Sequence, residues 1–164
     1  MADDTPYVRG AERLKRRIES IRRKTALPPL TDEIGGLLLK RTMERFDRQV
    51  DPDGKPWRPL APATVLRRRQ LGLGPEPKLV RTRALRDSIK LIRGSVPGST
   101  YTNTGAGVRI GIEDPEIAEY GAVQNRGDKA GRIPARRFLG IGRLDVKAVD
   151  SLLRRKARSL EAVE

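Results

Sequence analysis

The chain contains no cysteine and no histidine among its 164 residues. Without cysteine there is no disulfide framework, no zinc finger and no thiol nucleophile. Without histidine, the side chain that most often serves as a general acid or base is missing. Only carboxylates, hydroxyls, lysines and tyrosines remain for catalysis, and enzyme mechanisms that depend on histidine or cysteine are excluded.

Aromatic and long apolar stretches are also scarce. Aromatic residues make up 4% of the chain and hydrophobic residues 37%. We therefore expect a thin core to which partner chains add burial, and no aromatic platform for stacking bases. The longest apolar run surrounds Leu37–Leu39, far short of the roughly 20 residues that cross a membrane. No signal peptide is visible, so the sequence predicts a soluble protein made in the cytoplasm.

Positive charge is abundant. Lysine and arginine number 35 against 21 aspartates and glutamates, which gives a formal charge of +14. Such a surplus favours polyanionic partners, either nucleic acid or an acidic protein surface. Two interpretations stay open: direct contact with phosphates, or a basic surface placed within an acidic assembly. Any nucleic-acid contact is expected to be electrostatic, salt-dependent and without sequence preference.

The N-terminal segment predicts a basic helical arm over residues 1–30. Leu14, Ile18 and Ile21 form one narrow apolar stripe in an otherwise arginine-rich helix from about residue 7 to residue 24. A stripe this thin is atypical of a core helix. We expect the arm to lie on a neighbouring subunit, and residues 31–164 to form a single domain.

A second helix is predicted from Thr31, as its N-cap, to about Val50. Its predicted core face comprises Leu39, Met43, Phe46 and Val50. A proline-rich loop follows, in which Trp57 is expected to fill a gap between this helix and the sheet. Further helices are predicted at 62–71, 116–124 and 143–163, and strands at 89–92, 99–103 and 107–112. The apolar side of the last helix is predicted to comprise Val146, Val149, Leu153 and Leu160.

This order of elements predicts an α+β fold: a small antiparallel sheet of three to four strands, arranged as a meander, packed with N-terminal and C-terminal helices. The chain has no alternating βα units, no G-x-G-x-x-G and no G-K-[ST], which argues against a nucleotide-binding fold. The best candidates for a metal or acid–base site are Glu113, Asp114, Glu116 and Glu119. The simpler interpretation is that they offset the dipole of the helix they precede, with Asp114 as its cap. We expect no cofactor and no enzymatic activity.

The segment 120–140 predicts a docking element. A helical run ends at Arg126-Gly127, and a polar linker leads to Ile133-Pro134-Ala135-Arg136-Arg137-Phe138-Leu139-Gly140. Pro134 fixes the path of the backbone, Phe138 and Leu139 seek burial, and two arginines stand between them. We expect Phe138 and Leu139 to anchor a partner while Arg136 and Arg137 meet carboxylates or phosphates.

Four segments in order resemble the phage virion morphogenesis, or tail-completion, family of Mu-like long-tailed phages. They are Asp51-Pro52-Asp53-Gly54-Lys55-Pro56-Trp57, Arg83-x-Leu85-Arg86-Asp87-Ser88-Ile89, Tyr120-Gly121-Ala122-Val123-Gln124-Asn125-Arg126-Gly127 and Ile133–Gly140. The resemblance covers about residues 40–160 and leaves the N-terminal helix outside. Gln124 and Asn125 stand where the family often has His-Gln, and Arg137 where it often has Pro.

The resemblance implies a non-enzymatic virion protein at the head–tail junction, assembled in the host cytoplasm as a homo-oligomeric, expectedly hexameric, ring. Its partners would be other copies, neck or connector proteins and tail-terminator or tail-tube proteins, with DNA phosphate contact in the channel and no membrane. The alternative is a sequence-nonspecific nucleic-acid-binding protein. The predicted docking residues are Trp57, Tyr120, Gln124, Arg126, Pro134, Arg136, Arg137, Phe138 and Leu139. The predicted contacts to DNA or an acidic partner are Arg16, Arg17, Arg22, Arg23, Arg67, Arg68 and Arg69.

Overall fold

The computed structural model describes residues 16, 30–74, 77–80, 82–92, 100–103 and 109–161 of the chain. Within these ranges the helices are α2 (Leu30–Arg48), α3 (Pro62–Gln70), α4 (Ala84–Asp87), α5 (Pro115–Arg126) and α6 (Arg143–Glu161), and the strands are β1 (Ile89–Ile92), β2 (Thr100–Asn103) and β3 (Arg109–Ile112). The protein is therefore a mixed helix-and-strand fold with a small antiparallel sheet. The predicted N-terminal helix lies outside the described residues, except for Arg16, which is helical.

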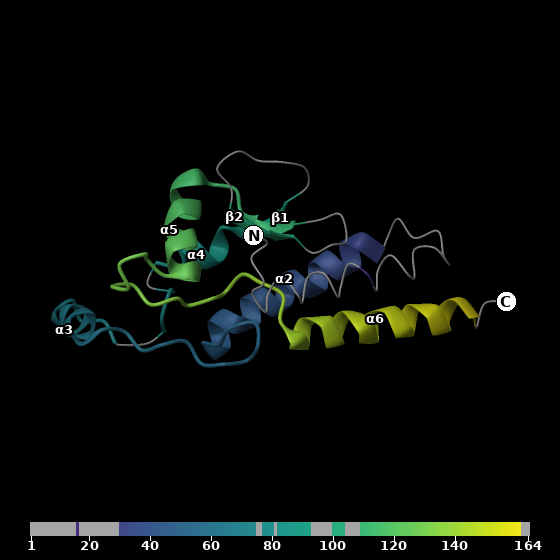
Figure 1. Cartoon of the computed structure of the whole chain (residues 1–164), viewed down its shortest axis with the longest axis horizontal. Coiled ribbons are helices and arrows are strands. Elements are labelled where there is room, and N and C mark those ends of the chain that lie inside the picture. Colours follow the sequence, from purple (N-terminus) through teal and green to yellow (C-terminus); the bar gives the residue numbers. More distant parts are fainter. Residues whose placement is uncertain are drawn as a thin grey trace.

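Helix α2 lies between two layers. It packs against β1 and β3 on one side and against α6 on the other, while α5 covers β2 and β3. Figure 1 shows α3 at one end of the long axis, away from the sheet, and the C-terminal end of α6 at the other. A salt bridge of 2.6 Å between Lys156 and Glu33 joins α6 to the first turn of α2.

The sheet has the order β1-β3-β2, with both pairs antiparallel. Ile112 of β3 stands opposite Ile89 of β1 and Thr100 of β2. The predicted meander, which would place β2 in the middle, is wrong. Strand β3 is buried at Ile110, Gly111 and Ile112, and a strand so thoroughly buried suits the centre of a sheet better than its edge.

Helix α2 begins at Leu30, so Thr31 is inside the helix and is not its cap. Asp32 and Glu33 do lie in the first turn, where carboxylates offset the helix dipole. Of the predicted core face, Phe46 is buried as expected, whereas Leu39 and Met43 are only partly buried and Val50 follows the helix. The buried residues are Leu30, Ile34, Gly35, Leu38, Thr42, Arg45 and Phe46.

Three aromatic rings form the centre of the core beside α2. Phe46 meets Trp57 edge-on at a centroid distance of 5.4 Å, and it packs against Phe138 in a tilted arrangement at 5.3 Å. Aromatic pairs in this geometry add to the stabilisation that area burial gives. The indole Nε1 of Trp57 also donates to the carbonyl oxygen of Arg137 at 3.0 Å. Trp57 thus fills the space between α2 and residues 137–138, within the same core cluster as the sheet residues Ile89 and Ile112.

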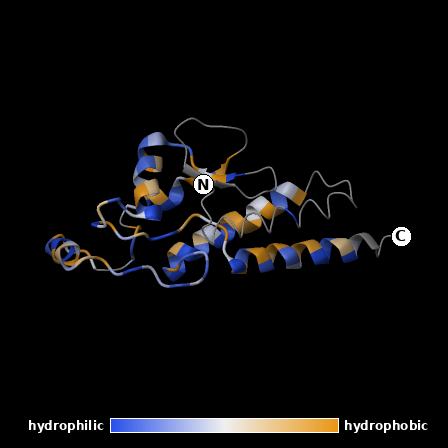
Figure 2. Cartoon of the chain, viewed as in Figure 1, coloured by the Kyte–Doolittle hydropathy of each residue, from blue (hydrophilic) through white to orange (hydrophobic). Residues whose placement is uncertain are grey.

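Helix α6 has one buried side. Val149 and Leu153 are buried and Val146 packs beside them, as its predicted apolar face requires. Hydrophobic and hydrophilic residues alternate along α6 and α2 at helical spacing (Figure 2). No helix in the described ranges is long and apolar enough to cross a membrane.

Candidate interaction surface

The predicted docking segment begins within helix α5, whose N-terminus has the cap that the sequence predicts. Asp114 caps it, because its carboxylate accepts hydrogen bonds from the backbone N–H groups of Glu116 and Ile117, and Pro115 occupies the first turn. The neighbouring carboxylates do not converge: in the described part of the chain no group of three or more acidic residues could hold a metal ion. This end of α5 is built to start a helix.

Residues 128–133 form a closed loop after α5. The backbone N–H of Asp128 donates to the carbonyl of Ile133 at 3.1 Å, and the N–H of Ile133 donates to the Asp128 carboxylate at 2.7 Å. This second bond is the main reason that the pKa of Asp128 is lowered, with a smaller contribution from the guanidinium of Arg132. The loop therefore returns the chain to the end of α5.

Asn125 and Gln124 then hold the following segment, residues 136–139, against α5. The side-chain oxygen of Asn125 accepts from the backbone N–H groups of Phe138 and Leu139, both at 2.9 Å. The carbonyl of Gln124 accepts from the N–H of Arg136 at 2.8 Å. The two segments that the sequence analysis compared with separate family motifs are therefore one hydrogen-bonded unit.

A buried ion pair between Arg45 and Asp145 also holds residues 138–140 in place. The guanidinium of Arg45, which is 5% exposed, donates to the carbonyls of Phe138 and Gly140 at 2.8 and 3.0 Å and to the carboxylate of Asp145. Asp145 also accepts from Arg41 at 2.7 Å. Burial lowers the pKa of Arg45, and the Asp145 charge opposes this. The pair ties α2, the 138–140 backbone and α6 together.

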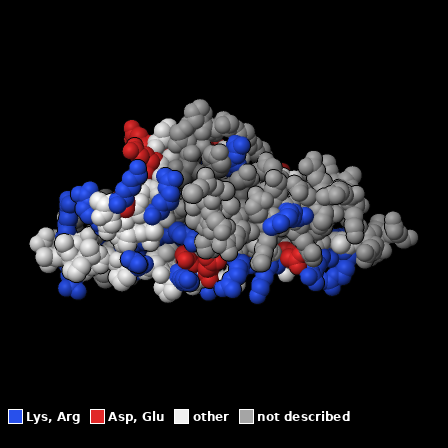
Figure 3. All heavy atoms as spheres, viewed as in Figure 1, with Lys and Arg blue, Asp and Glu red and all other residues white. Residues whose placement is uncertain are grey.

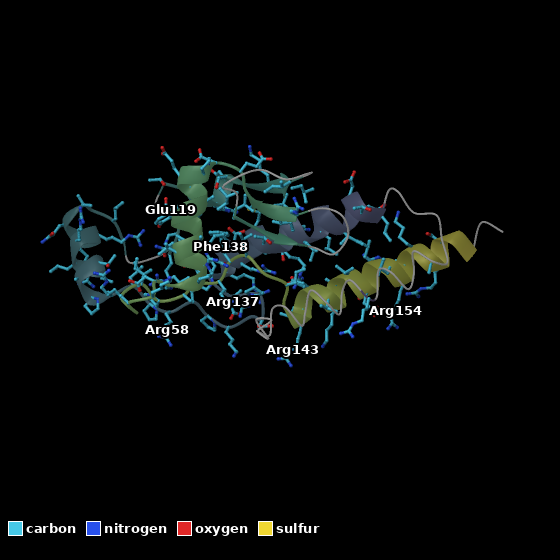
Figure 4. All side chains as sticks on the ribbon, turned by 45° about the horizontal axis from the view of Figure 1, so that its top comes forward. Arg58, Glu119, Arg137, Phe138, Arg143 and Arg154 are labelled. Atoms are coloured by element: carbon cyan, nitrogen blue, oxygen red, sulfur yellow. The ribbon has the colours of Figure 1, made fainter. Side chains whose placement is uncertain are left out.

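Most of the residues predicted to dock a partner are covered by the chain itself, which corrects that interpretation. Phe138 and Leu139 pack into the core beside α2, and Figure 4 shows Phe138 in the interior between α5 and α2. Trp57 is buried as described above. Gln124, at 9% exposed, and Arg136, at 4%, are buried too.

Arg136 does not face an external anion. Its guanidinium donates to the carbonyls of Arg58 and Pro59 at 3.0 and 2.8 Å and so holds the proline-rich loop. The expectation that it meets partner carboxylates or DNA is therefore wrong. Arg137 is partly buried, 4.0 Å from the carboxylate of Asp53, and its Nη2 has no hydrogen-bond partner. Of this set, Tyr120 and Arg126 are exposed and Pro134 is partly exposed.

The predicted basic contacts are in part on the surface. Arg16, Arg67 and Arg69 are exposed, while Arg68 is partly buried and reaches the carbonyl of Pro77 at 3.4 Å. Arg17, Arg22 and Arg23 lie outside the described residues. A second basic surface was not assigned from the sequence: Arg143, Lys147, Arg154 and Arg158 follow one exposed face of α6. Their spacing of three to four residues, or multiples of it, was the signal for that face. Figure 4 labels two of them, Arg143 and Arg154.

A groove of about 700 Å³ separates α3 from α5. Thr64, Arg67 and Leu71 line its α3 side, and Glu116, Ile117 and Tyr120 line its α5 side. The lining thus combines apolar side chains with charges of both signs, which is a composition typical of a protein contact surface.

Residues 10–157 match the sequence model of the phage virion morphogenesis family. The chain belongs to this family. The match begins at residue 10, so it includes most of the predicted N-terminal basic helix, which the four motifs do not reach. Among curated proteins and among solved structures, no significant match was found.

Membership of the phage virion morphogenesis family places the protein in phage structure or assembly. The backbone carbonyl of Gln124 and the side-chain oxygen of Asn125 both accept hydrogen bonds from the 136–139 backbone. In this chain the segment therefore serves as an internal clamp that needs no histidine.

Proposed function

We propose that the protein is a non-enzymatic component of the head–tail junction of a long-tailed phage. In this proposal several copies form a ring that completes the upper end of the tail and lets it join the DNA-filled head. The observation that carries the proposal is the family match over residues 10–157. The ring's partners are other copies, neck or connector proteins, and tail-terminator or tail-tube proteins.

The fold supports a structural role. The described carboxylates serve as a helix cap, as ion-pair partners or as exposed charges, and none stands in a cluster suited to metal chemistry. The backbone of residues 137–138 is held by hydrogen bonds to the side chains of Asn125, Arg45 and Trp57. Such internal bracing keeps the surrounding surfaces in fixed positions, which assembly into a particle requires.

Loss of the gene tests this role. Without the protein, infected cells are expected to accumulate DNA-filled heads and separate tails, and supplying the wild-type chain from a plasmid restores joined particles. Electron microscopy of lysates distinguishes these products. Normal joined virions in the absence of the protein would exclude the proposed role, as would empty or misshapen heads.

A second candidate function is sequence-nonspecific contact with nucleic acid through α6. Arg143, Lys147, Arg154 and Arg158 extend over about 22 Å of the helix. Among the α6 residues whose side chains the structure describes, Asp150 offsets charge on this face through its 2.9 Å bond to Arg154. This spacing suits phosphates along a duplex, and DNA passing through a ring would present them.

Duplex binding over a series of salt concentrations tests the second function. Affinity is expected to fall steeply with salt, and a double Arg143→Glu, Lys147→Glu variant should have a shallower slope. An affinity that is weak at low salt, or indifferent to salt, would rule this function out. The matched control is Lys40→Glu, Lys129→Glu, which changes the charge by the same amount at two exposed positions outside α6.

A further inference from the structure

Helix α3 has nine residues, and none of them is fully buried; only Val65 and Arg68 are half-buried. Isolated helices shorter than about 12–15 residues are marginal in water, so helicity in proteins depends on packing of an apolar face. Leu66 and Leu71 are instead 58% and 61% exposed. The two leucines therefore need an apolar surface from outside the described part of the chain to cover them.

The chemistry of the α3 arm, residues 60–74, defines that partner. The arm contains Arg67, Arg68 and Arg69 and no acidic residue. Within the described part of the chain, Arg67 and Arg69 form no salt bridge. A surface that combines exposed leucines with the side chains of Arg67 and Arg69 is complementary to an apolar or aromatic surface bordered by carboxylates.

Helix α5 of the same protein offers such a surface. Glu116, Glu119 and Tyr120 lie at i, i+3 and i+4 and therefore share one helix face. Tyr120 is 51% exposed, and both glutamates are exposed and without a salt bridge in the described ranges. Figure 3 shows acidic side chains gathered at one end of α5 and basic ones over α3, and Figure 4 places Glu119 on the outside of α5.

The α3 arm does not cover this face within one chain, because the groove of about 700 Å³ lies between α3 and α5. We propose that the α3 arm of one copy packs on the Glu116–Glu119–Tyr120 face of α5 in a second copy. The two contacting surfaces are different, so the contact is head-to-tail, and repetition of a head-to-tail contact closes into a ring when the rotation allows. The inference deepens the proposed ring function and rests on it.

Charge exchange tests this contact. Variant A carries Arg67→Glu and Arg69→Glu, and variant B carries Glu116→Lys and Glu119→Lys. In each variant alone, arm and face have the same sign of charge, so self-association measured by analytical ultracentrifugation should weaken at least about tenfold. In an equimolar mixture every arm finds a face of opposite sign, and association should return.

The matched control is Lys147→Glu, Arg155→Glu on α6, which changes the net charge as much as variant A and should leave association unaltered. Failure of the mixture to recover, with both variants folded, would overturn the inference. If variant A instead loses only DNA binding and the mixture restores nothing, α3 is a nucleic-acid surface and the inference is wrong.

Cross-linking gives a readout that works inside assembling cells, because the chain has no cysteine. Chains with Leu66→Cys and Tyr120→Cys, distinguished by tags of different size, are co-expressed with a phage lacking its own copy and treated with a short bifunctional maleimide. A mixed dimer is expected. The control is Leu144→Cys, at a leucine that is 44% exposed on α6, which should not cross-link to either partner.

Equal yields with Leu144→Cys, or no mixed dimer in assembled particles, would overturn the inference. So would a Leu66→Cys, Tyr120→Cys double variant that cross-links only within single chains. The proposed function fails separately: normal head–tail joining without the protein would reject that function even if the mixed dimer forms.

Discussion

The side-chain oxygen of Asn125 accepts a hydrogen bond of 2.9 Å from the backbone N–H of Phe138. The same oxygen accepts from Leu139, so one amide at the end of α5 satisfies two successive donors of the following segment. This bond holds Phe138 at the position where its ring packs on Phe46. A polar residue on α5 thus determines where an apolar residue enters the core.

Replacing Asn125 with leucine should destabilise the fold. Both backbone donors lose their acceptor, and a partly buried donor without a partner costs about 1–3 kcal/mol. Urea unfolding followed by circular dichroism measures the loss. Asn125→Asp is the matched control, because it keeps an acceptor oxygen and should retain most of the stability. Equal losses in the two variants would show that the oxygen is not what holds the segment.

Phe138→Ala should lower the free energy of unfolding by about 3–5 kcal/mol, because the ring is completely buried. If Phe138 instead anchored a partner, as its sequence context suggests, the variant would be stable but defective in assembly. Tyr120→Ala is the comparison, since that ring is half exposed and its loss should hardly alter unfolding. Thermal denaturation of the two variants distinguishes these roles.

Arg45→Met should cost about 3–5 kcal/mol, because Asp145 is fully buried and loses its closest cation. Arg41 remains beside Asp145 and should keep the loss towards the lower value. Chemical denaturation is the measurement, with Arg48→Met as a control at an exposed position of the same helix. If the control loses as much stability, the effect comes from the helix and not from the buried pair.

Two glycines should respond to alanine in opposite directions. A Cβ at Gly142 would overlap the carbonyl oxygen of Pro52, so Gly142→Ala is expected to cost about 1–3 kcal/mol. A Cβ at Gly36 meets nothing within 4 Å, and Gly36→Ala within α2 should stabilise by about 0.5–1 kcal/mol. Melting temperatures of the pair test this. A fall for Gly36→Ala would mean that another chain approaches α2 there.

The loop 128–133 should loosen in acid. The pKa of Asp128 is below its usual value of 3.8 in the folded protein, so its contribution to stability is fully present above that value and is lost as pH falls through the lowered pKa. The protection of the Ile133 amide, taken as its exchange rate relative to that of an unstructured peptide at the same pH, should decrease from about pH 5 to about pH 2. Asp128→Asn should abolish this pH dependence, and its persistence would assign the effect to another carboxyl group.

Local signals in the sequence predicted several elements correctly. Asp114 and Pro115 indicated the start of α5, and Val149 and Leu153 indicated the buried side of α6. These features depend on neighbours within a turn or two, which a single sequence displays. The sheet order did not follow in the same way, because pairing of β1 with β3 depends on contacts between distant segments.

The candidate site was harder to predict, for a physical reason. Arg45 lies on the apolar face of α2 and its partner Asp145 is 100 residues away, so hydrophobic periodicity alone showed Arg45 as an interruption. Arg136 and Phe138 suggested an outward-facing element, yet the carbonyls that accept from Arg136 belong to residues 58 and 59. The sequence showed that these side chains require hydrogen-bond or packing partners, and in the fold those partners are distant residues of the same chain.

We propose above that the chain forms part of a ring at the head–tail junction, and a cryo-electron microscopy reconstruction of the virion neck and upper tail would reveal such a ring. A closed ring of density is expected between head and tail, and α2, α5, α6 and the sheet should fit this density in every subunit. Density for this chain elsewhere in the particle, or its absence from purified virions, would exclude the ring.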